Sequence, residues 1–265
     1  MARFAKLWLL RVAAGLHLDG RLAKRGYMIC GMSRSGSTYL CQLLASTGVL
    51  GRPIEFFNTE ARKRTHGIAY PADLRAQLFV IRSLGATDNG IYGVKLLYSH
   101  LRFFPAGFSP FERLPDLHFV RLSRRDLLAQ AISLARARQT GKWGILMPPK
   151  GNASYQPDQI RECLTELAEQ AEYWDRTIAR LGVNPVCFDY ETVVQNPQAA
   201  VDRIAALMGL AGSRPIDPGR ITASIQRDLV NEEWRLRFLK ETGDEFRHLA
   251  AVSKPPSAQG SASVS

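Results

Sequence analysis

The chain has 265 residues, of which 46% are hydrophobic and 22% charged, and its formal net charge is +11 at pH 7. Such a length can bury one large α/β core, and the composition excludes disordered and fibrous classes. This excess of basic residues suits a binding partner that is a nucleic acid, an anionic membrane surface or a small polyanion. Because no zinc-finger spacing or basic-aromatic ribonucleoprotein motif is present, we do not expect nucleic acid as a partner.

Residues 1–26 form a basic, amphipathic extension. Lys6, Arg11 and His17 interrupt its apolar runs, so it is too broken for the roughly 20 apolar residues of a membrane span. No clean signal-peptide cleavage site follows it. We expect a cytoplasmic protein in which this extension is a helix packed on the domain or on a partner, or a helix lying in a membrane interface as a peripheral contact.

Residues 27–47 predict a strand, a phosphate loop and a helix in succession. The strand is the apolar run 27–30, and from Thr38 apolar residues recur at helical spacing until Gly48 ends the helix. Between them, residues 31–38 (GMSRSGST) have the glycine spacing of a Walker A loop, with Ser37 at the lysine position.

The chemistry of this loop is that of an anion site. Its backbone N–H groups and the positive end of the following helix would face an anion, with Arg34 as the cation inside the loop. A serine at the lysine position argues against magnesium-dependent triphosphate cleavage. It favours a ligand with one bridging phosphate beside another anionic group. The alternative interpretation is a helix cap with a flexible approach.

The later elements alternate between strands and helices. Strands are predicted at 90–97, 117–122 and 185–191, and helices at 72–84, from 127 onward, at 157–181, at 197–208 and within 226–241. This order predicts a three-layer, P-loop-like α/β fold with a mainly parallel sheet of about four to five strands flanked by helices. We expect one domain over 27–250 and a flexible tail over 251–265.

A second anion site is predicted after the third strand. Arg124 would lie at the carboxyl end of that strand, where open α/β sheets bind ligands, and Ser133 lies nine positions later in the next helix. The guanidinium fork of arginine suits a terminal phosphate. Asp126 should stabilise the first turn of the helix. The alternative is a solvated surface arginine and an incidental serine.

The four cysteines do not form a metal-binding pattern. Cys30, Cys41, Cys163 and Cys187 stand in apolar contexts without a paired short spacing. We therefore expect no metal site and a reducing compartment.

Five short motifs together resemble the bacterial trehalose sulfotransferase family. They follow that family's order, cover most of residues 27–240, and are SRSGST (33–38), GRPIEFF (51–57), GVKL (93–96), Arg124 with QAIS (130–133), and Glu233–Trp234. The phosphate loop with the Arg…Ser pair is similar to the wider sulfotransferase superfamily, which uses 3′-phosphoadenosine 5′-phosphosulfate (PAPS).

The resemblance implies sulfuryl transfer from PAPS to a hydroxyl of a carbohydrate or glycolipid, without a metal, and a homodimer. Arg124 and Ser133 would hold the 3′-phosphate, Glu55 would be the general base, and Lys95 is a candidate for a cation that meets the charge of the leaving phosphate. The 5′-phosphosulfate would be bound by Ser33, Arg34, Ser35, Gly36, Ser37 and Thr38. The acceptor would lie near Arg52, Pro53, Glu55, Phe56 and Phe57.

The role of Glu55 has alternatives. Its neighbours Ile54, Phe56 and Phe57 would raise its pKa by desolvation, which suits a general base, but an ion pair with Arg52 would explain the residue equally well. Other candidate bases are His66, His100 and His118, of which His118 fits a core position.

Two further residues have structural alternatives. Lys95 could instead extend from a strand end to solvent. Trp234 could stack on adenine, with Gln226 and Arg227 near the 3′-phosphate, or it could form a helical core stripe with Phe238 and Leu239.

Two other functions compete with sulfuryl transfer. One is a P-loop kinase for a small metabolite, and the other is a non-enzymatic module that binds nucleotide or phosphoinositide. The resemblance also departs at Ser33, where the trehalose enzymes carry glutamine, so the acceptor is expected only as a saccharide or glycolipid.

Overall fold

The computed structural model describes residues 22–58, 74–101, 104, 109–144, 147–223 and 229–243. The strands are β1 (Arg25–Gly31), β2 (Ile91–Leu97), β3 (Leu117–Ser123) and β4 (Val186–Asp189). The helices are α2 (Ser37–Ser46), α4 (Leu74–Leu84), α5 (Tyr98–Leu101), α6 (Pro110–Arg113), α7 (Leu127–Thr140), α8 (Pro157–Leu181), α9 (Tyr190–Gln195), α10 (Pro197–Leu207), the 3₁₀ turn η1 (Pro218–Arg220) and α11 (Leu229–Thr242).

The strands form one parallel sheet. Their order is β2-β1-β3-β4, which places β1 and β3 in the centre. Because all four strands run the same way, the loops after Gly31, Leu97 and Ser123 leave from one edge of the sheet. The predicted parallel α/β sheet is confirmed, with four strands among the described residues.

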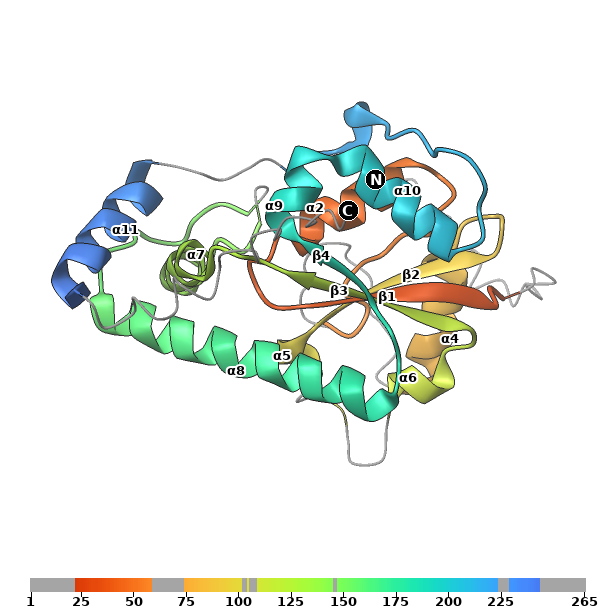
Figure 1. The fold of residues 1–265 in the computed structure, drawn as a ribbon, viewed down its shortest axis with the longest axis horizontal. Coiled ribbons are helices and arrows are strands. Elements are labelled where there is room, and N and C mark those ends of the chain that lie inside the picture. Colours follow the sequence, from red (N-terminus) through yellow and green to blue (C-terminus); the bar gives the residue numbers. More distant parts are fainter. Residues whose placement is uncertain are drawn as a thin grey trace, which may run out of the picture.

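Helices cover both faces of the sheet, so β1 is apolar on both sides. Met28 and Cys30 pack into the core that α7 and α8 share, while Tyr27 and Ile29 pack against α2 and α10. Figure 1 shows α8 running along one face and α2, α9 and α10 on the other. A strand buried on both faces reads as a continuous apolar run, which is why residues 27–30 predicted it. The three-layer arrangement is confirmed.

Several element ends agree with their predicted signals. Asp126 accepts a hydrogen bond from the Ala129 N–H at 3.0 Å and caps α7. Helix α8 begins at Pro157 and ends before Gly182, which has φ 63°. The start of α7 and both ends of α8 are therefore set by residues at those positions in the sequence.

The fourth strand is shorter than predicted. Asp189 accepts a hydrogen bond from the Thr192 N–H at 2.8 Å, so it caps a new helix instead of continuing the strand. Tyr190 and Glu191, predicted as the polar end of the strand, belong to α9. Tyr190, the first residue of α9, lies close to Gly36 of the phosphate loop.

Some predictions fall outside the described residues. These are the N-terminal helix up to residue 21, the tail at 251–265, His66, and the approach of Gln226 and Arg227 to the second phosphate. Among the helices of the described ranges, none has the length and apolar character needed to cross a membrane.

Candidate active site

The loop between β1 and α2 has the backbone conformation of an anion site. Arg34 (φ 63°) and Gly36 (φ 81°) are left-handed on either side of Ser35, and such changes of handedness gather N–H groups around an anion. Gly36 precedes α2 without a side chain that could cap it. Gly36 is thus the N-cap residue of α2, no side-chain hydrogen bond caps the helix, and the positive end of α2 faces the loop.

The loop is held by hydrogen bonds from two helices and by one hydrogen bond of its own. The buried indole Nε1 of Trp174 in α8 donates to the Gly31 carbonyl at 2.9 Å, and Gln130 Nε2 in α7 donates to the Ser33 carbonyl at 2.8 Å. Inside the turn, the buried Ser35 hydroxyl donates to the Met32 carbonyl at 2.8 Å. The loop is thus ordered by the protein itself, which lowers the entropy cost of binding an anion.

Gly36→Ala is expected to weaken nucleotide binding at least tenfold and to lower the free energy of unfolding by about 2 kcal/mol. A methyl group there would lie 2.1 Å from Tyr190 Cδ2, at a backbone angle that side chains rarely adopt. Calorimetry with 3′,5′-bisphosphoadenosine and urea unfolding measure the two effects. Gly48→Ala is the control, since Gly48 has φ 71° and nothing within 4 Å of an added Cβ. Equal effects of both variants on nucleotide affinity would contradict the prediction.

The structure brings the predicted second anion site against the first. Arg34 donates from Nε to Ser133 Oγ at 2.8 Å and from Nη1 to the Trp143 carbonyl at 2.9 Å. Arg124 donates to the Arg34 carbonyl at 3.3 Å, and its guanidinium lies 5.2 Å from the ring centroid of Tyr190. Arg34 and Ser133 are 99 positions apart in the sequence but are hydrogen-bonded in the structure. The residues predicted for the two phosphates therefore form one cluster.

Positive charge is concentrated in this cluster. Burial lowers the pKa of Arg34, and the charges of Arg124 and Arg136 lower it further. Like charges held together in a partly buried place favour an anion between them. Arg136 was not predicted, although it stands one helical turn after Ser133 in α7 and so shares its face.

Trp234 lies in the interior, behind Arg136. The indole is 4% exposed, packs edge-on against Tyr155 at 5.8 Å between centroids, and lies 5.9 Å from the Arg136 guanidinium. Phe238 is buried beside it, while Leu239 is 43% exposed. The core interpretation therefore describes Trp234 and Phe238 but not Leu239. Stacking of Trp234 on adenine stays a prediction.

Glu55 lies beside the phosphate loop because its segment runs along β2. Ile54 forms a parallel bridge with Val94, and the Lys95 N–H donates to the Ile54 carbonyl at 3.0 Å. The Lys95 Nζ then lies 2.7 Å from Glu55 Oε1 and donates to Thr38 Oγ1 at 3.0 Å. One ammonium group therefore joins the predicted base to the phosphate loop.

The two alternatives for these residues are wrong. Lys95 is 6% exposed, so it does not extend to solvent. Arg52 donates to the Ala86 carbonyl at 2.9 Å, whereas the carboxylate of Glu55 pairs with Lys95.

The expected rise in the pKa of Glu55 is also wrong. Burial does raise it, but the charge of Lys95 and the hydrogen bond from His100 more than offset this, so the pKa of Glu55 lies well below its usual value. The apolar neighbours of Glu55 in the sequence predicted only the rise in its pKa that burial causes. Lys95 has a raised pKa: its burial alone would lower it, and the charge of Glu55 outweighs that. The pair is ionised over the physiological pH range.

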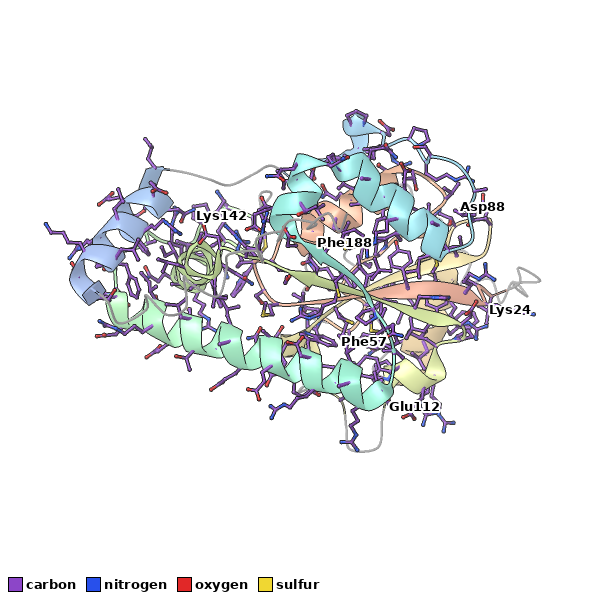
Figure 2. The ribbon with its side chains drawn as sticks, in the orientation of Figure 1. Lys24, Phe57, Asp88, Glu112, Lys142 and Phe188 are labelled. Atoms are coloured by element: carbon purple, nitrogen blue, oxygen red, sulfur yellow. The ribbon has the colours of Figure 1, made fainter. Side chains whose placement is uncertain are left out.

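The residues that flank Glu55 are mostly packed inward. Pro53, Phe56 and Phe57 are buried, and Phe57 packs edge-on against Phe104 at 4.9 Å between centroids. In the view of Figure 2, Phe57 lies on the side of the sheet along which α8 runs, and it belongs to the core cluster that contains residues of α8. Arg52 is exposed. The buried side chains of Pro53, Phe56 and Phe57 pack around the segment that carries Glu55. The contact of Arg52, Pro53, Phe56 and Phe57 with an acceptor stays a prediction.

The histidines differ from one another. His100 is 3% exposed and lies 3.4 Å from Glu55. The side chain of His118 is 35% exposed and lies 3.2 Å from Asp116, so its predicted core position is wrong. It is the second residue of β3 and lies near the start of that strand, whereas the phosphate loop follows the carboxyl end of β1.

The described residues contain no group of three histidine, cysteine, aspartate or glutamate side chains placed to hold a metal ion. All four cysteines are free, with Cys187 exposed and the others buried.

Comparison with known proteins points to one sulfotransferase family. The family model described as Stf0 sulphotransferase matches residues 26–241. Trehalose 2-sulfotransferase of Mycobacterium tuberculosis (strain ATCC 35801 / TMC 107 / Erdman) is 26% identical over 83% of this chain and 96% of its own length. Trehalose 2-sulfotransferase of Mycolicibacterium smegmatis (strain ATCC 700084 / mc(2)155) is 25% identical over 81% of this chain and 94% of its own length.

Proposed function

The chain belongs to the Stf0 sulphotransferase family, and from this premise we propose that it transfers a sulfuryl group from PAPS to a hydroxyl of a carbohydrate or glycolipid. The observation that carries the proposal is the contact of Lys95 with both Glu55 and Thr38, at 2.7 and 3.0 Å. A carboxylate beside a phosphate loop can accept a proton where a group on that loop is transferred. Family membership favours this function over the kinase and the binding module.

The donor would be held by two adjoining sets of groups. The loop from Ser33 to Thr38 offers N–H groups and hydroxyls for the phosphosulfate, and Arg124 with Ser133 offers a guanidinium and a hydroxyl for the 3′-phosphate. Arg34 lies between the two sets, since its side chain contacts Ser133 and its carbonyl contacts Arg124. The loop is already ordered and the cluster is positive, so the residues present fit a small nucleotide with two separate anionic groups.

The reaction would use Glu55 and Lys95 for opposite tasks. Glu55 accepts the proton of the acceptor hydroxyl while the oxygen of that hydroxyl bonds to sulfur and the bond between sulfur and the bridging phosphate oxygen breaks. The leaving bisphosphate keeps the electron pair. Its new charge is stabilised by the loop N–H groups and by the ammonium of Lys95, which are in place before the reaction.

Trehalose is the first acceptor to test, because both relatives are named for it. We propose a wider class of saccharide or glycolipid acceptors, since Ser33 replaces the glutamine of the trehalose enzymes on the loop. Peripheral membrane contact through the N-terminal residues and a homodimer remain part of the proposal.

The test of this function is mass-resolved transfer from labelled PAPS to trehalose, to other disaccharides and to a bacterial glycolipid extract, in the presence of a metal chelator. A sulfated product with any of these acceptors supports the proposal. Binding of the nucleotide without any sulfated product would overturn it, and so would phosphate transfer from ATP that requires magnesium.

Arg124→Ala is expected to weaken binding of 3′,5′-bisphosphoadenosine by about tenfold to a hundredfold, and binding of adenosine 5′-phosphate much less. The reason is that Arg124 should contact only the 3′-phosphate. Calorimetry with both ligands measures the difference. Arg125→Ala is the matched control, because Arg125 is exposed and pairs with Asp189 at 3.1 Å. Equal losses for the two ligands would contradict the assignment of Arg124.

A further inference from the structure

His100 is a buried titratable residue that the proposed reaction does not use. It lies in α5, directly after β2, and is 3% exposed. Its Nδ1 accepts a hydrogen bond from the Leu97 N–H at 3.2 Å. Because a backbone amide can only donate, Nδ1 must be the acceptor, and the single proton of the neutral ring is at Nε2.

The protonated nitrogen faces Glu55. His100 Nε2 lies 3.4 Å from Glu55 Oε2, and Asn58 Nδ2 donates to the same oxygen at 2.8 Å. The other oxygen, Oε1, lies 2.7 Å from Lys95 Nζ, which also contacts Thr38 in the phosphate loop. The two oxygens of the carboxylate therefore have different surroundings, one toward α5 and one toward the loop.

We propose that His100 is a positioning residue for Glu55: it fixes the rotation of the carboxylate so that Oε1, on the side of the phosphate loop, takes the proton of the acceptor. This inference rests on the proposed function. In the step, the hydroxyl proton moves to Oε1, the acceptor oxygen bonds to sulfur, and the bisphosphate leaves with the electron pair. Asn58 assists by donating a hydrogen bond to the same oxygen, Oε2, at 2.8 Å.

A neutral donor suits this task better than a second cation. The charged and titratable groups facing Glu55 are Lys95 from β2, His100 from α5 and Cys41 from α2, and Arg34 acts on Lys95 from the loop. Lys95 already reduces the proton affinity of the carboxylate. Another full positive charge would reduce it further, whereas a neutral N–H orients the group with a smaller loss of basicity.

Two variants of His100 separate its two hydrogen bonds. His100→Asn keeps an acceptor near Nδ1 for the Leu97 N–H but removes the donor to Glu55. His100→Gln can place an amide donor near the position of Nε2. We expect His100→Asn to lower kcat about tenfold to a hundredfold, with unchanged affinity for 3′,5′-bisphosphoadenosine, and His100→Gln to retain most of kcat.

Two readouts distinguish positioning from a merely structural role. Nitrogen NMR of the nucleotide-free protein should show a neutral His100 protonated at Nε2. The acid limb of the pH profile of kcat/KM should move to higher pH in His100→Asn, because the ionised carboxylate loses a donor. A ring protonated at Nδ1, an unchanged kcat in His100→Asn, or equal losses in both variants with an unmoved acid limb would overturn the inference. If the wild type transfers no sulfuryl group, the proposed function fails; if it does and His100→Asn matches it, only the positioning role fails.

Discussion

Glu55→Gln is expected to lower the rate of sulfuryl transfer by at least about a hundredfold, as expected for a lost general base. Glutamine has nearly the same shape, and its carbonyl can still accept hydrogen bonds from His100 and Asn58, which leaves its amide nitrogen facing Lys95. The amide cannot take the proton of a hydroxyl. The loss should appear in kcat, since Glu55 is assigned to the chemical step and not to the donor. Single-turnover transfer from PAPS measures it.

Donor affinity provides the internal control for Glu55→Gln. Lys95 loses its counter-charge in this variant but keeps its contact with Thr38, so binding of 3′,5′-bisphosphoadenosine should be unchanged or slightly tighter. Glu112→Gln, a change of the same kind at an exposed position in α6, should leave both quantities as in the wild type. Retained turnover in Glu55→Gln would assign the role of base to another residue.

The sequence was most informative where a signal was local. The apolar run of β1, the glycine loop and the ends of α8 at Pro157 and Gly182 all predicted their own structure. At the end of β4 a local signal was also present, but the predicted strand through residue 191 was wrong. Asp189 is a strong N-cap residue, and it begins α9 where polar residues suggested a strand end.

The anion cluster could be predicted in outline because topology decides it. In a parallel sheet, loops that follow neighbouring strands meet at one edge, and Arg34 and Arg124 follow β1 and β3. The detailed contacts could not be predicted in the same way. Arg34 contacts Ser133 from a left-handed backbone position, and no residue pattern indicates that conformation for a non-glycine residue.

The surroundings of Glu55 show why the direction of a pKa shift needs three-dimensional contacts. Neighbours in sequence predicted desolvation, which is present. The outcome is set by Lys95 and His100, which reach Glu55 through the pairing of Ile54 with Val94 and the turn after β2. A buried carboxylate with a lysine at 2.7 Å is ionised. Glu55 and Lys95 are 40 positions apart in the sequence, and no local pattern indicates their contact.

Lys95→Met is expected to lower the free energy of unfolding at pH 7 by about 2 to 3 kcal/mol, because it leaves a mostly buried carboxylate without its partner. The Lys95 side chain is 8% exposed and that of Glu55 24%, so the carboxylate regains only part of its hydration. Urea unfolding measures the loss. Lys142→Met is the control, since Lys142 is exposed after α7 (Figure 2).

The pH dependence of this loss follows from the depressed pKa of Glu55 in the wild type. A carboxyl whose folded pKa is depressed adds stability above its unfolded pKa, near 4.3, and this stability disappears as the pH falls through the folded value. In Lys95→Met the pKa of Glu55 must rise. As the pH falls, Glu55 becomes protonated, and the cost of burying an unpaired carboxylate is removed from the free energy of unfolding of the variant. The difference between variant and wild type should therefore shrink between pH 7 and about pH 4. An equal difference at both values would contradict a role for the ion pair.

The double variant Lys95→Met/Glu55→Gln separates stability from chemistry. Replacing both charges removes the unpaired carboxylate, so most of the lost free energy of unfolding should return relative to Lys95→Met alone. Transfer activity should stay at or below that of Glu55→Gln, because the double variant lacks both the base and the ammonium that stabilises the leaving group. A stable double variant without transfer would show that this buried pair is retained for the reaction at the phosphate loop. Recovery of transfer together with stability would show that Lys95 and Glu55 only support the fold.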